Sequence, residues 1–379
     1  MSEPLPVSVV IPAYNRPEMV ARAVRSALEQ RPRPPAEVIV VDDCSSDDTA
    51  AAASAAGARV IRHEVNRGEG AARNTAIREA QHEWVALLDS DDEFLPGHLA
   101  ALWPHRNGHV ILGSSAIAVA PDPADDTLIG RPGWGPEVLS SPGRLLRRGN
   151  ALVAPSVMMR KDVAVKVGLF AEHLERAADL DLWLRMLEHG TGYVSSDVTV
   201  RYHVHAGQVS GDVLKMCEAH AAVVDAYRDR PWMSRAVGAQ SETRLLWDTL
   251  RLEMRRGRRR AALAGLWQIV RDPLKARWLV DLLAYRVRLG RHRGRYTRSG
   301  GQTIRLWTSS PELVGAAAER GLEVIEPLEP RGLLEGLSGV LRRPAGVTIT
   351  DSGLRAAIAR AAGSSVVRPR RDGAGLPGS

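Results

Sequence analysis

The sequence of Trp84–Asp92 is WVALLDSDD, and this stretch decides the predicted fold. A continuous apolar run with the length of a buried strand ends directly in three aspartates and a serine. Such a strand would deliver acidic side chains to the edge of a sheet. Mg²⁺ and Mn²⁺ prefer oxygen ligands, and a bound diphosphate can supply ligands that a sparse protein site leaves open. The alternative is an ordinary Asp-rich turn, because Asp and Ser are common in turns.

Composition places the chain among globular proteins. Its 379 residues carry a formal net charge of +7, and 44% of them are hydrophobic, which is enough to build one large domain or two ordinary ones. The two cysteines, Cys44 and Cys217, are distant and form no CxxC pattern, so neither a disulfide framework nor a zinc site is predicted. The N-terminus lacks the pattern of a signal peptide, and no apolar run has the length of a membrane span. We therefore expect a cytoplasmic protein.

Strand and helix patterns alternate along the first hundred residues. We expect strands at Val7–Ile11, Glu37–Val41, Ala58–Arg62 and around Trp84. We expect helices at Glu18–Glu29 and Ala71–Ala80, and an Ala-rich helix that ends at about Ala56. Alternation at this spacing predicts a mostly parallel sheet with helices on both faces. Ligands bind such sheets at the carboxyl ends of the strands, and the acidic clusters after Val41 and Leu88 both fall at such ends.

Two common nucleotide-binding motifs are absent from the first loop. The dinucleotide fingerprint needs GxGxxG after the first strand, and the phosphate loop of nucleoside triphosphatases ends in GK[ST]. Residues Ile11–Pro17, IPAYNRP, contain neither. A dinucleotide-binding domain and a P-loop domain are therefore excluded as readings of this region.

Four motifs do occur in order: VVIPAYN at 9–15, VDDCSSD at 41–47, NRG at 66–68 followed by ARN at 72–74, and DSDD at 89–92. Together they resemble family 2 glycosyltransferases with the GT-A fold. The resemblance covers about Val7–Leu99 and continues more loosely to about Gly211. It implies an α/β, GT-A nucleotide-diphospho-sugar transferase fold, in which a mostly parallel central sheet lies between helices, as a catalytic domain at residues 1–211.

The resemblance also implies a site for the donor, a nucleotide-diphosphate sugar. The first loop would flank the base and one acidic residue of the second motif, Asp42 or Asp43, would accept a hydrogen bond from the ring N–H. The implied donor-binding residues are Pro12, Ala13, Tyr14, Asn15, Asp42, Asp43, Asn66, Gly68, Arg73, Asp89 and Ser90. Turn and cap roles are the alternative for these polar residues, and Asp47 in particular can cap the next helix.

By the same resemblance Asp91 is the main ligand of a divalent metal, Mn²⁺ or Mg²⁺. Asp89 would bind ribose or help to orient the metal, and Asp92 is left without a role. Further along, the strand Arg201–His205 ends in a histidine that reaches the metal or the diphosphate in some family members. A neutral imidazole ligates Mn²⁺ more readily than Mg²⁺, so His205 is a candidate metal ligand, while a structural role in the strand is the alternative.

The catalytic base is expected at Asp179. The segment Gly168–Glu172, GLFAE, is a variant of the Gly-Gly-Phe-Asp-Glu turn of the family, and ADLDLWLR follows at 178–185. The second residue of an acidic pair at this place is the general base of the family, but Ala178 stands where Glu is usual. A carboxylate at a helix N-terminus is also favoured by the helix dipole, so a structural role is the competing interpretation of Asp179.

The rest of the chain is expected to form separate regions. Residues 121–149 are rich in Pro, Gly and Asp and are predicted to be a loop over the site. A basic helical region should span 212–298, a small α/β domain 299–369 and a disordered tail 370–379. Residues 255–298 hold fourteen Arg and Lys against two Asp, a net of +12.

That basic region suits an anionic membrane surface or an anionic acceptor, and a solvated helical face is the alternative. Nucleic acid is disfavoured, because no recognised nucleic-acid module accompanies the charge.

The sequence as a whole predicts an inverting, metal-dependent glycosyltransferase that uses a UDP or dTDP sugar and an acceptor of unknown identity. The alternative is a non-catalytic nucleotide-sugar-binding or scaffold module, and the oligomeric state stays open.

Overall fold

The computed structural model describes residues 3–121, 127–130, 136–148, 150–205, 208, 213–280, 283, 305–307 and 323–325. The chain divides into two units after Leu328, and the second unit lies outside the described residues. The predicted tail at 370–379 therefore lies outside them, as does most of the α/β domain predicted at 299–369. Of that domain only β11 (Arg305–Trp307) and β12 (Glu323–Ile325) are described, and they pair in parallel.

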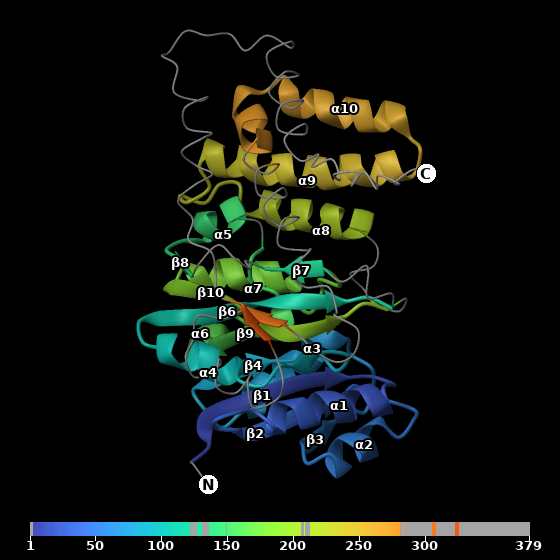
Figure 1. The fold of residues 1–379 in the computed structure, drawn as a ribbon, viewed down its shortest axis with the longest axis vertical. Coiled ribbons are helices and arrows are strands. Elements are labelled where there is room, and N and C mark those ends of the chain that lie inside the picture. The colour runs from blue at the N-terminus through green and yellow to red at the C-terminus, as the bar shows by residue number, and fades with distance from the viewer. Residues whose placement is uncertain are drawn as a thin grey trace, which may run out of the picture. The chain divides into compact units, whose positions relative to one another are not determined.

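In the described residues, ten strands form one mixed sheet (Figure 1). Eight of them follow the order β3 (Arg59–Arg62), β2 (Pro35–Asp42), β1 (Leu5–Ala13), β4 (Trp84–Leu87), β9 (Val157–Arg160), β6 (His109–Val119), β10 (Thr191–His203) and β5 (Glu93–Phe94). The other two, β7 (Thr127–Ile129) and β8 (Glu137–Leu139), pair with β6 and β10. The first four strands are parallel, and so are β6 and β10. Strand β9 runs antiparallel between β4 and β6 and joins the two parallel groups.

Helices cover both faces of this sheet, as the alternating pattern predicted. Strand β1 shows why, because Val9 and Val10 are both fully buried and belong to different apolar clusters on opposite faces. One face packs against α1 (Pro17–Leu28), α2 (Thr49–Ala55) and α4 (His98–Leu102). The other packs against α3 (Glu69–Glu79), α5 (Pro142–Arg148), α6 (Lys161–Lys166) and α7 (Ala178–Leu187). Short 3₁₀ turns occupy Trp103–His105 and Ala154–Ser156.

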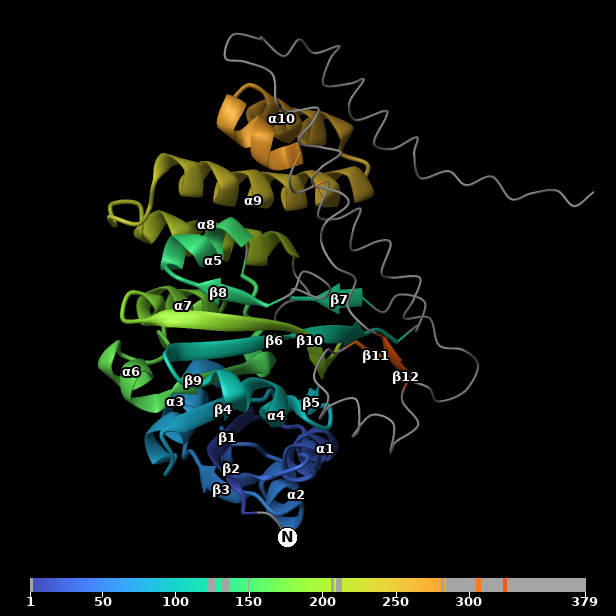
Figure 2. The same cartoon turned by 60° about the vertical axis from the view of Figure 1, so that its left-hand side comes forward.

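In the described part of the chain, the sheet is followed by helical residues at 273–280 and by three longer helices. They are α8 (Val213–Ala226), α9 (Arg235–Arg255) and α10 (Arg259–Val270), and α9 packs between α8 and α10 (Figures 1 and 2). Helix α8 contacts α7 and α9 contacts α5, so this layer joins the face that carries α7. Within the described ranges, none of the helices combines the length and the hydropathy needed to cross a bilayer.

The prediction that residues 121–149 form a loop was wrong for the part that the structure describes. Strand β7 (Thr127–Ile129) pairs with β6, β8 (Glu137–Leu139) pairs with β10, and α5 begins at Pro142. Ser141 accepts a hydrogen bond from the backbone N–H of Arg144 (3.3 Å), as a helix-capping serine does. The strands are only three residues long, so they depend on their sheet partners rather than on a local pattern.

Asn74 on α3 fixes the turn that follows α6. Its side-chain amide donates to the carbonyl of Phe170 (2.9 Å) and to Glu172 (3.1 Å), and its oxygen accepts from the backbone N–H of Phe170 (2.9 Å). The Asn side chain is almost fully buried, as is Phe170. Asn74 of the ARN motif therefore has a structural role, because its amide replaces water as the hydrogen-bond partner of the backbone N–H and C=O of Phe170.

We expect Asn74→Ala to lower the free energy of unfolding by about 2–4 kcal/mol, because it leaves two buried backbone groups of Phe170 without a partner. Chemical denaturation of both proteins measures the change. The matched control is Gln81→Ala, an exposed amide just beyond the same helix, which should change stability by less than about 0.5 kcal/mol. Equal stability of the Asn74 and Gln81 variants would contradict the anchoring role.

Candidate active site

The predicted acidic clusters meet at one edge of the sheet. Strand β1 pairs in parallel with β2 on one side and with β4 on the other, with Ala13 opposite Asp42 and Val10 opposite Leu87. The chain leaves all three strands at the same end, so the loop after β1, the loop after β2 and the Asp89–Asp92 turn are neighbours. This arrangement agrees with the expectation that ligands bind at the carboxyl ends.

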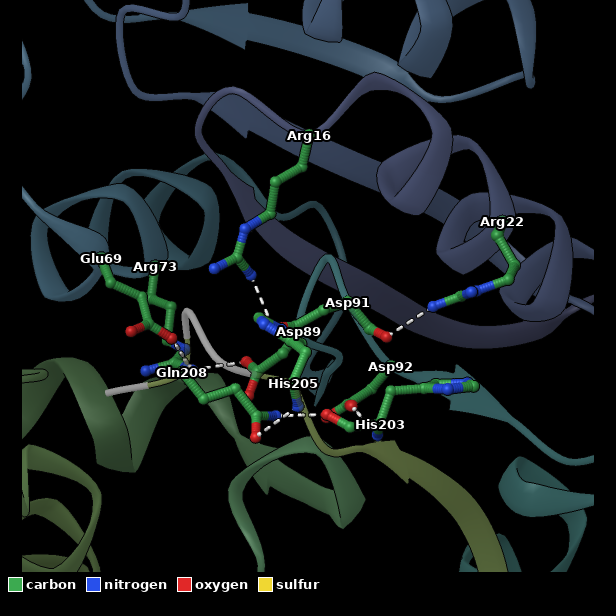
Figure 3. Close-up of polar contacts among 10 residues, drawn as sticks. All are labelled: Arg16, Arg22, Glu69, Arg73, Asp89, Asp91, Asp92, His203, His205 and Gln208. Atoms are coloured by element: carbon green, nitrogen blue, oxygen red, sulfur yellow. Dashed lines mark hydrogen bonds and ion pairs between the residues drawn. The ribbon is translucent and has the colours of Figure 1, made fainter. Parts of the chain in front are cut away.

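Asp91 lies at the centre of this edge between a cation and an imidazole (Figure 3). Its carboxylate oxygen Oδ2 accepts from Arg16 Nη1 at 2.5 Å and lies 2.8 Å from His205 Nε2. Arg22 of α1 donates to the backbone carbonyl of Asp91 at 2.7 Å. The predicted pair Asp91 and His205 is thus brought together from residues 114 positions apart.

Asp89 is held by Arg73. Arg73 Nη2 donates to Asp89 Oδ1 at 2.5 Å and also contacts Glu69, and its guanidinium lies 5.3 Å from the ring centre of Phe170. Burial raises the pKa of Asp89 to about 6, although the charge of Arg73 opposes the rise. The positive charge of Arg73 therefore offsets the negative charge of the Asp89–Asp92 turn directly. Any contact between Arg73 and a donor would be additional.

Asp92, which the sequence left without a role, is fully buried. The backbone N–H of His203 donates to its Oδ1 at 2.8 Å, while Oδ2 has no hydrogen-bond partner in the described part of the chain. Burial raises the pKa of Asp92 to about 9, and the neighbouring charges of Asp89 and Asp91 add to the effect. Asp92 is therefore a neutral carboxylic acid near pH 7 that ties the turn to the end of β10.

The two acidic residues after β2 differ in what they bind. Asp43 is buried and accepts from the backbone N–H groups of Arg67 and Gly68 (2.7 Å to Gly68), and it lies 2.7 Å from His63 Nδ1. Asp42 Oδ1 accepts from the Ser45 N–H at 3.0 Å. Its Oδ2 lies 3.3 Å from Arg62 Nε in an ion pair and has no hydrogen-bond partner among the described residues. Asp43 shapes the loop at 63–68, and Asp42 keeps one oxygen with acceptor capacity.

The loop after β1 is joined to the loop after β2. Asn15 has a left-handed backbone (φ 51°); its N–H donates to Ser45 Oγ and its Oδ1 accepts from the Ser46 N–H, both at 2.9 Å. Pro12 and Ala13 are buried, whereas the Tyr14 side chain is 46% exposed at this edge. Asn66 is exposed and Ser90 is buried.

Asp47 acts as a cap at the start of α2. Its Oδ1 accepts from the backbone N–H of Thr49 at 3.0 Å, in the first residue of the helix. Thr49 in turn accepts from the backbone N–H of Arg16 at 2.8 Å. The cap interpretation of Asp47 is thus the one that its contacts favour, and it helps to hold Arg16 in place.

Asp179 lies in the first turn of α7, after Ala177, which has a left-handed backbone (φ 57°). Asn150 donates its side-chain amide to Asp179 Oδ2 at 3.0 Å. Although burial alone lowers the pKa of Arg73, the carboxylates Asp89, Glu69 and Asp179 together hold it above its ordinary value. Asp179 therefore shares the electrostatic environment of the Asp89–Asp92 turn.

Asp181, the other acidic residue in the first turn of α7, has a different environment. It accepts from Arg185 at 2.5 Å and from the Tyr227 hydroxyl at 2.7 Å. Arg185 also donates to the carbonyls of Val167 and Leu169. Asp181 therefore has structural partners of its own, whereas Asp179 is the carboxylate of this turn whose charge reaches Arg73.

Sequence reasoning missed several residues of this site. Arg16 directly follows the first motif and could have been found as a cation next to it. His220 on α8 lies outside the motifs; burial lowers its pKa, and the charge of Asp179 opposes that shift, which places the imidazole near the carboxylate. No feature of the sequence around Arg22 or Asn150 indicated that these residues belong to the site.

Within the described ranges, no group of three or more His, Cys, Asp and Glu side chains is arranged to hold a metal ion. Asp91 and His205 are the two donors that converge, one oxygen and one nitrogen. A carboxylate with an imidazole suits Mn²⁺, and phosphate oxygens of a nucleotide would complete the coordination of Mn²⁺ or Mg²⁺. These two residues fit the expected metal as a partial ligand set.

Residues 8–121 match the model of a protein family described as Glycosyl transferase family 2. These residues belong to glycosyl transferase family 2. The matched region holds the four motifs and the Asp89–Asp92 turn, whereas Asp179 and His205 lie beyond it. The chain is 34% identical over 202 residues to the succinoglycan biosynthesis protein ExoU of Rhizobium meliloti. The aligned residues cover 50% of this chain and 59% of that protein. The chain thus spans little more than half the length of this relative.

Solved structures share the fold of the family 2 region. The chain is similar to the mannosyltransferase PcManGT from Pyrobaculum calidifontis in complex with GDP-Man and Mn²⁺ (TM-score 0.50, 18% identity, 75% of this chain and 83% of that one). It is also similar to TarS 1–349 of S. aureus in complex with UDP-GlcNAc (TM-score 0.50, 20% identity, 63% and 71%). These likenesses confirm the expected GT-A fold.

We expect Asp43→Ala to lower the free energy of unfolding by about 2–4 kcal/mol, because the buried His63 ring and the backbone N–H groups of Arg67 and Gly68 lose a charged acceptor at once. Thermal unfolding monitored by circular dichroism measures the loss. Asp48→Ala is the matched control, since Asp48 is exposed and its side chain makes no cap bond at the start of α2. An Asp43 variant as stable as the Asp48 variant would show that the loop at 63–68 holds its shape without Asp43.

Proposed function

We propose that this protein is a metal-dependent, inverting glycosyltransferase that moves a sugar from a nucleotide-diphosphate sugar to an acceptor hydroxyl. The observation that carries the proposal is the convergence of Asp91, His205 and Arg16 at the ends of β1 and β4, with Asp179 acting on the same Arg73 that holds Asp89. The acceptor class is a glycan, a lipid-linked saccharide, a natural product or a peptide.

The donor would bind at the loops after β1 and β2. Tyr14 offers an exposed ring for the base. Asp42 is fully buried beside Arg62, and its Oδ2 would accept from a ring N–H once the donor has displaced Arg62. Uracil, thymine and guanine carry such a ring N–H, whereas neutral adenine and cytosine do not, and among these we propose a UDP or dTDP sugar as the donor. The nucleotide sugars bound by TarS and PcManGT support the use of this donor class.

Asp91 and His205 would hold Mn²⁺ or Mg²⁺ beside the diphosphate. When bound, the metal would supply neutralisation of the charge that develops on the leaving diphosphate. Arg16 contacts the same Asp91 oxygen as His205, so it competes with a cation for that oxygen and is placed to bind the diphosphate when displaced. The Mn²⁺ complex of PcManGT supports the metal assignment.

Asp179 would take the proton from the acceptor hydroxyl. An alcohol is a weak nucleophile until a positioned base removes its proton in the transition state. Asn150 holds one carboxylate oxygen of Asp179 and so orients the other. Attack on the anomeric carbon opposite the leaving diphosphate inverts its configuration.

A non-catalytic nucleotide-sugar-binding module is the alternative function. Ala178 favours it, because the family usually has Glu beside the base and this chain lacks that carboxylate. The two functions differ in one measurable property, since a binding module holds the donor without ever cleaving it.

We expect Asp179→Asn to lower the rate of donor hydrolysis in the presence of Mn²⁺ by roughly 10²–10⁴-fold, because the amide cannot accept the proton. The dissociation constant of the donor should stay within about twofold, measured by calorimetry. Asp162→Asn on α6 is the control, since Asp162 is exposed and paired with Arg160. Loss of donor binding in the Asp179 variant would make that residue structural, and an inactive wild type that binds donor would favour the binding module.

We expect Arg16→Ala to tighten the binding of Mn²⁺ alone about fivefold, which corresponds to about 1 kcal/mol, because the guanidinium no longer competes for Asp91. Asp91→Ala should abolish that binding. Electron paramagnetic resonance of free Mn²⁺ in the absence of donor measures both changes. Arg25→Ala, an exposed cation in the last turn of α1, controls for the change in net charge. If Arg16→Ala and Arg25→Ala bind Mn²⁺ equally, Arg16 does not compete at this site.

A further inference from the structure

Helix α10 carries an apolar centre flanked by arginines on the face that points away from α9. Its buried residues, Ala262 and Ile269, pack toward the interior. At 100° per residue the opposite face presents residues spaced by three, four and seven positions. These exposed residues, which we call the α10 stripe, are Arg260, Leu263, Ala264, Trp267 and Arg271.

The apolar residues of the α10 stripe are unusually accessible. Leu263 is 64% exposed and Trp267 is 65% exposed, and they lie one turn apart on the same face. Met254, at the end of α9, is 52% exposed. Large apolar side chains that gather on one surface rimmed by polar residues mark an interaction site rather than ordinary surface.

The charge around the stripe is strongly positive. Arg256, Arg258 and Arg259 are exposed beside Arg260, at the turn between α9 and α10. The nearby acidic residues are Glu253, which is buried and lies 3.8 and 3.7 Å from Arg256 and Arg258, and the half-buried Asp272. The surface therefore presents more cationic than anionic groups to a partner, and that partner must be anionic.

We propose that the α10 stripe docks on the surface of a membrane that contains anionic lipids. Leu263 and Trp267 enter the boundary between headgroups and acyl chains, and Arg260 and Arg271 extend to the phosphates on either side. The helix lies in the plane of the interface with its buried face against α9. The stripe lies outside residues 8–121, so the proposal does not depend on the glycosyltransferase function.

Other partners fit this surface less well. A second copy packed face to face across a two-fold axis would bring the arginines at the two ends of one stripe against those of the other, which costs energy through like-charge repulsion. A hydrated anionic polymer could pair with the arginines, but contact with Leu263 would add little binding free energy because such a polymer has no apolar surface to bury that side chain. A lipid interface satisfies the charge and the apolar centre together.

Co-sedimentation of the full chain with vesicles tests the proposal. We expect binding to vesicles of phosphatidylcholine with 30% phosphatidylglycerol, and at least about tenfold weaker binding to phosphatidylcholine alone, since the exposed arginines are attracted to an anionic surface. Leu263→Ala/Trp267→Ala and Arg260→Glu/Arg271→Glu should each weaken binding about tenfold or more. Donor hydrolysis without vesicles should be unchanged in both variants.

The controls change the same chemistry at other places. Val165→Ala removes an exposed apolar side chain on α6, and Arg25→Glu/Arg31→Glu makes the same change in net charge; both should bind as the wild type does. Wild-type protein that fails to sediment with the anionic vesicles overturns the proposal, as do stripe variants that bind normally. Binding to soluble heparin that survives Leu263→Ala/Trp267→Ala, with no vesicle binding, would assign the arginines to an anionic polymer. An oligomer that dissociates in the Leu263/Trp267 variant, seen by light scattering, would assign the stripe to a second copy.

Discussion

Burial of three carboxyl groups at the end of β4 is the constraint on which the site depends. Asp91 and Asp92 are buried and Asp89 nearly so, and a charge removed from water is costly unless a partner compensates it. Each of the three carboxyl groups avoids an uncompensated charge: Asp89 pairs with Arg73, Asp91 pairs with Arg16, and Asp92 keeps its proton. An acidic turn is thus stable before any cation or nucleotide binds.

The same constraint explains the neighbouring loops. The backbone N–H of Arg16 donates to Thr49, whose own N–H donates to Asp47 at the start of α2, and these bonds help to hold Arg16 beside Asp91. Arg73 can reach Asp89 because α3 begins at the loop that Asp43 shapes, and because Asn74 fixes Phe170 beneath the guanidinium. Polar residues that look like a ligand-binding set in the sequence are therefore partly the framework that positions the ligand-binding groups.

The sequence predicted the strand ends and missed the contacts between them. Apolar runs closed by acidic residues indicated β2 and β4 and their shared edge, because buried parallel strands leave a continuous pattern in the chain. The short strands β7 and β8 left no such pattern, since their stability comes from partners in β6 and β10. The split between Asp42 and Asp43 was also unpredictable, because it depends on where the backbone of Arg67 and Gly68 passes.

Under the proposed function, donor and acceptor chemistry would be divided along the chain. The acidic turn and the loops after β1 and β2 lie in residues 8–121, whereas Asp179, Asn150 and His220 come from elements beyond that region. Asn150 lies two residues beyond the end of α5, and His220 lies on α8, so the surroundings of the proposed base depend on how α5, α7 and α8 pack. A change in that packing would alter which hydroxyl reaches Asp179 while leaving the carboxylates at β4 untouched. Under the proposed function, the helical layer is therefore where this chain would set its acceptor independently of its donor.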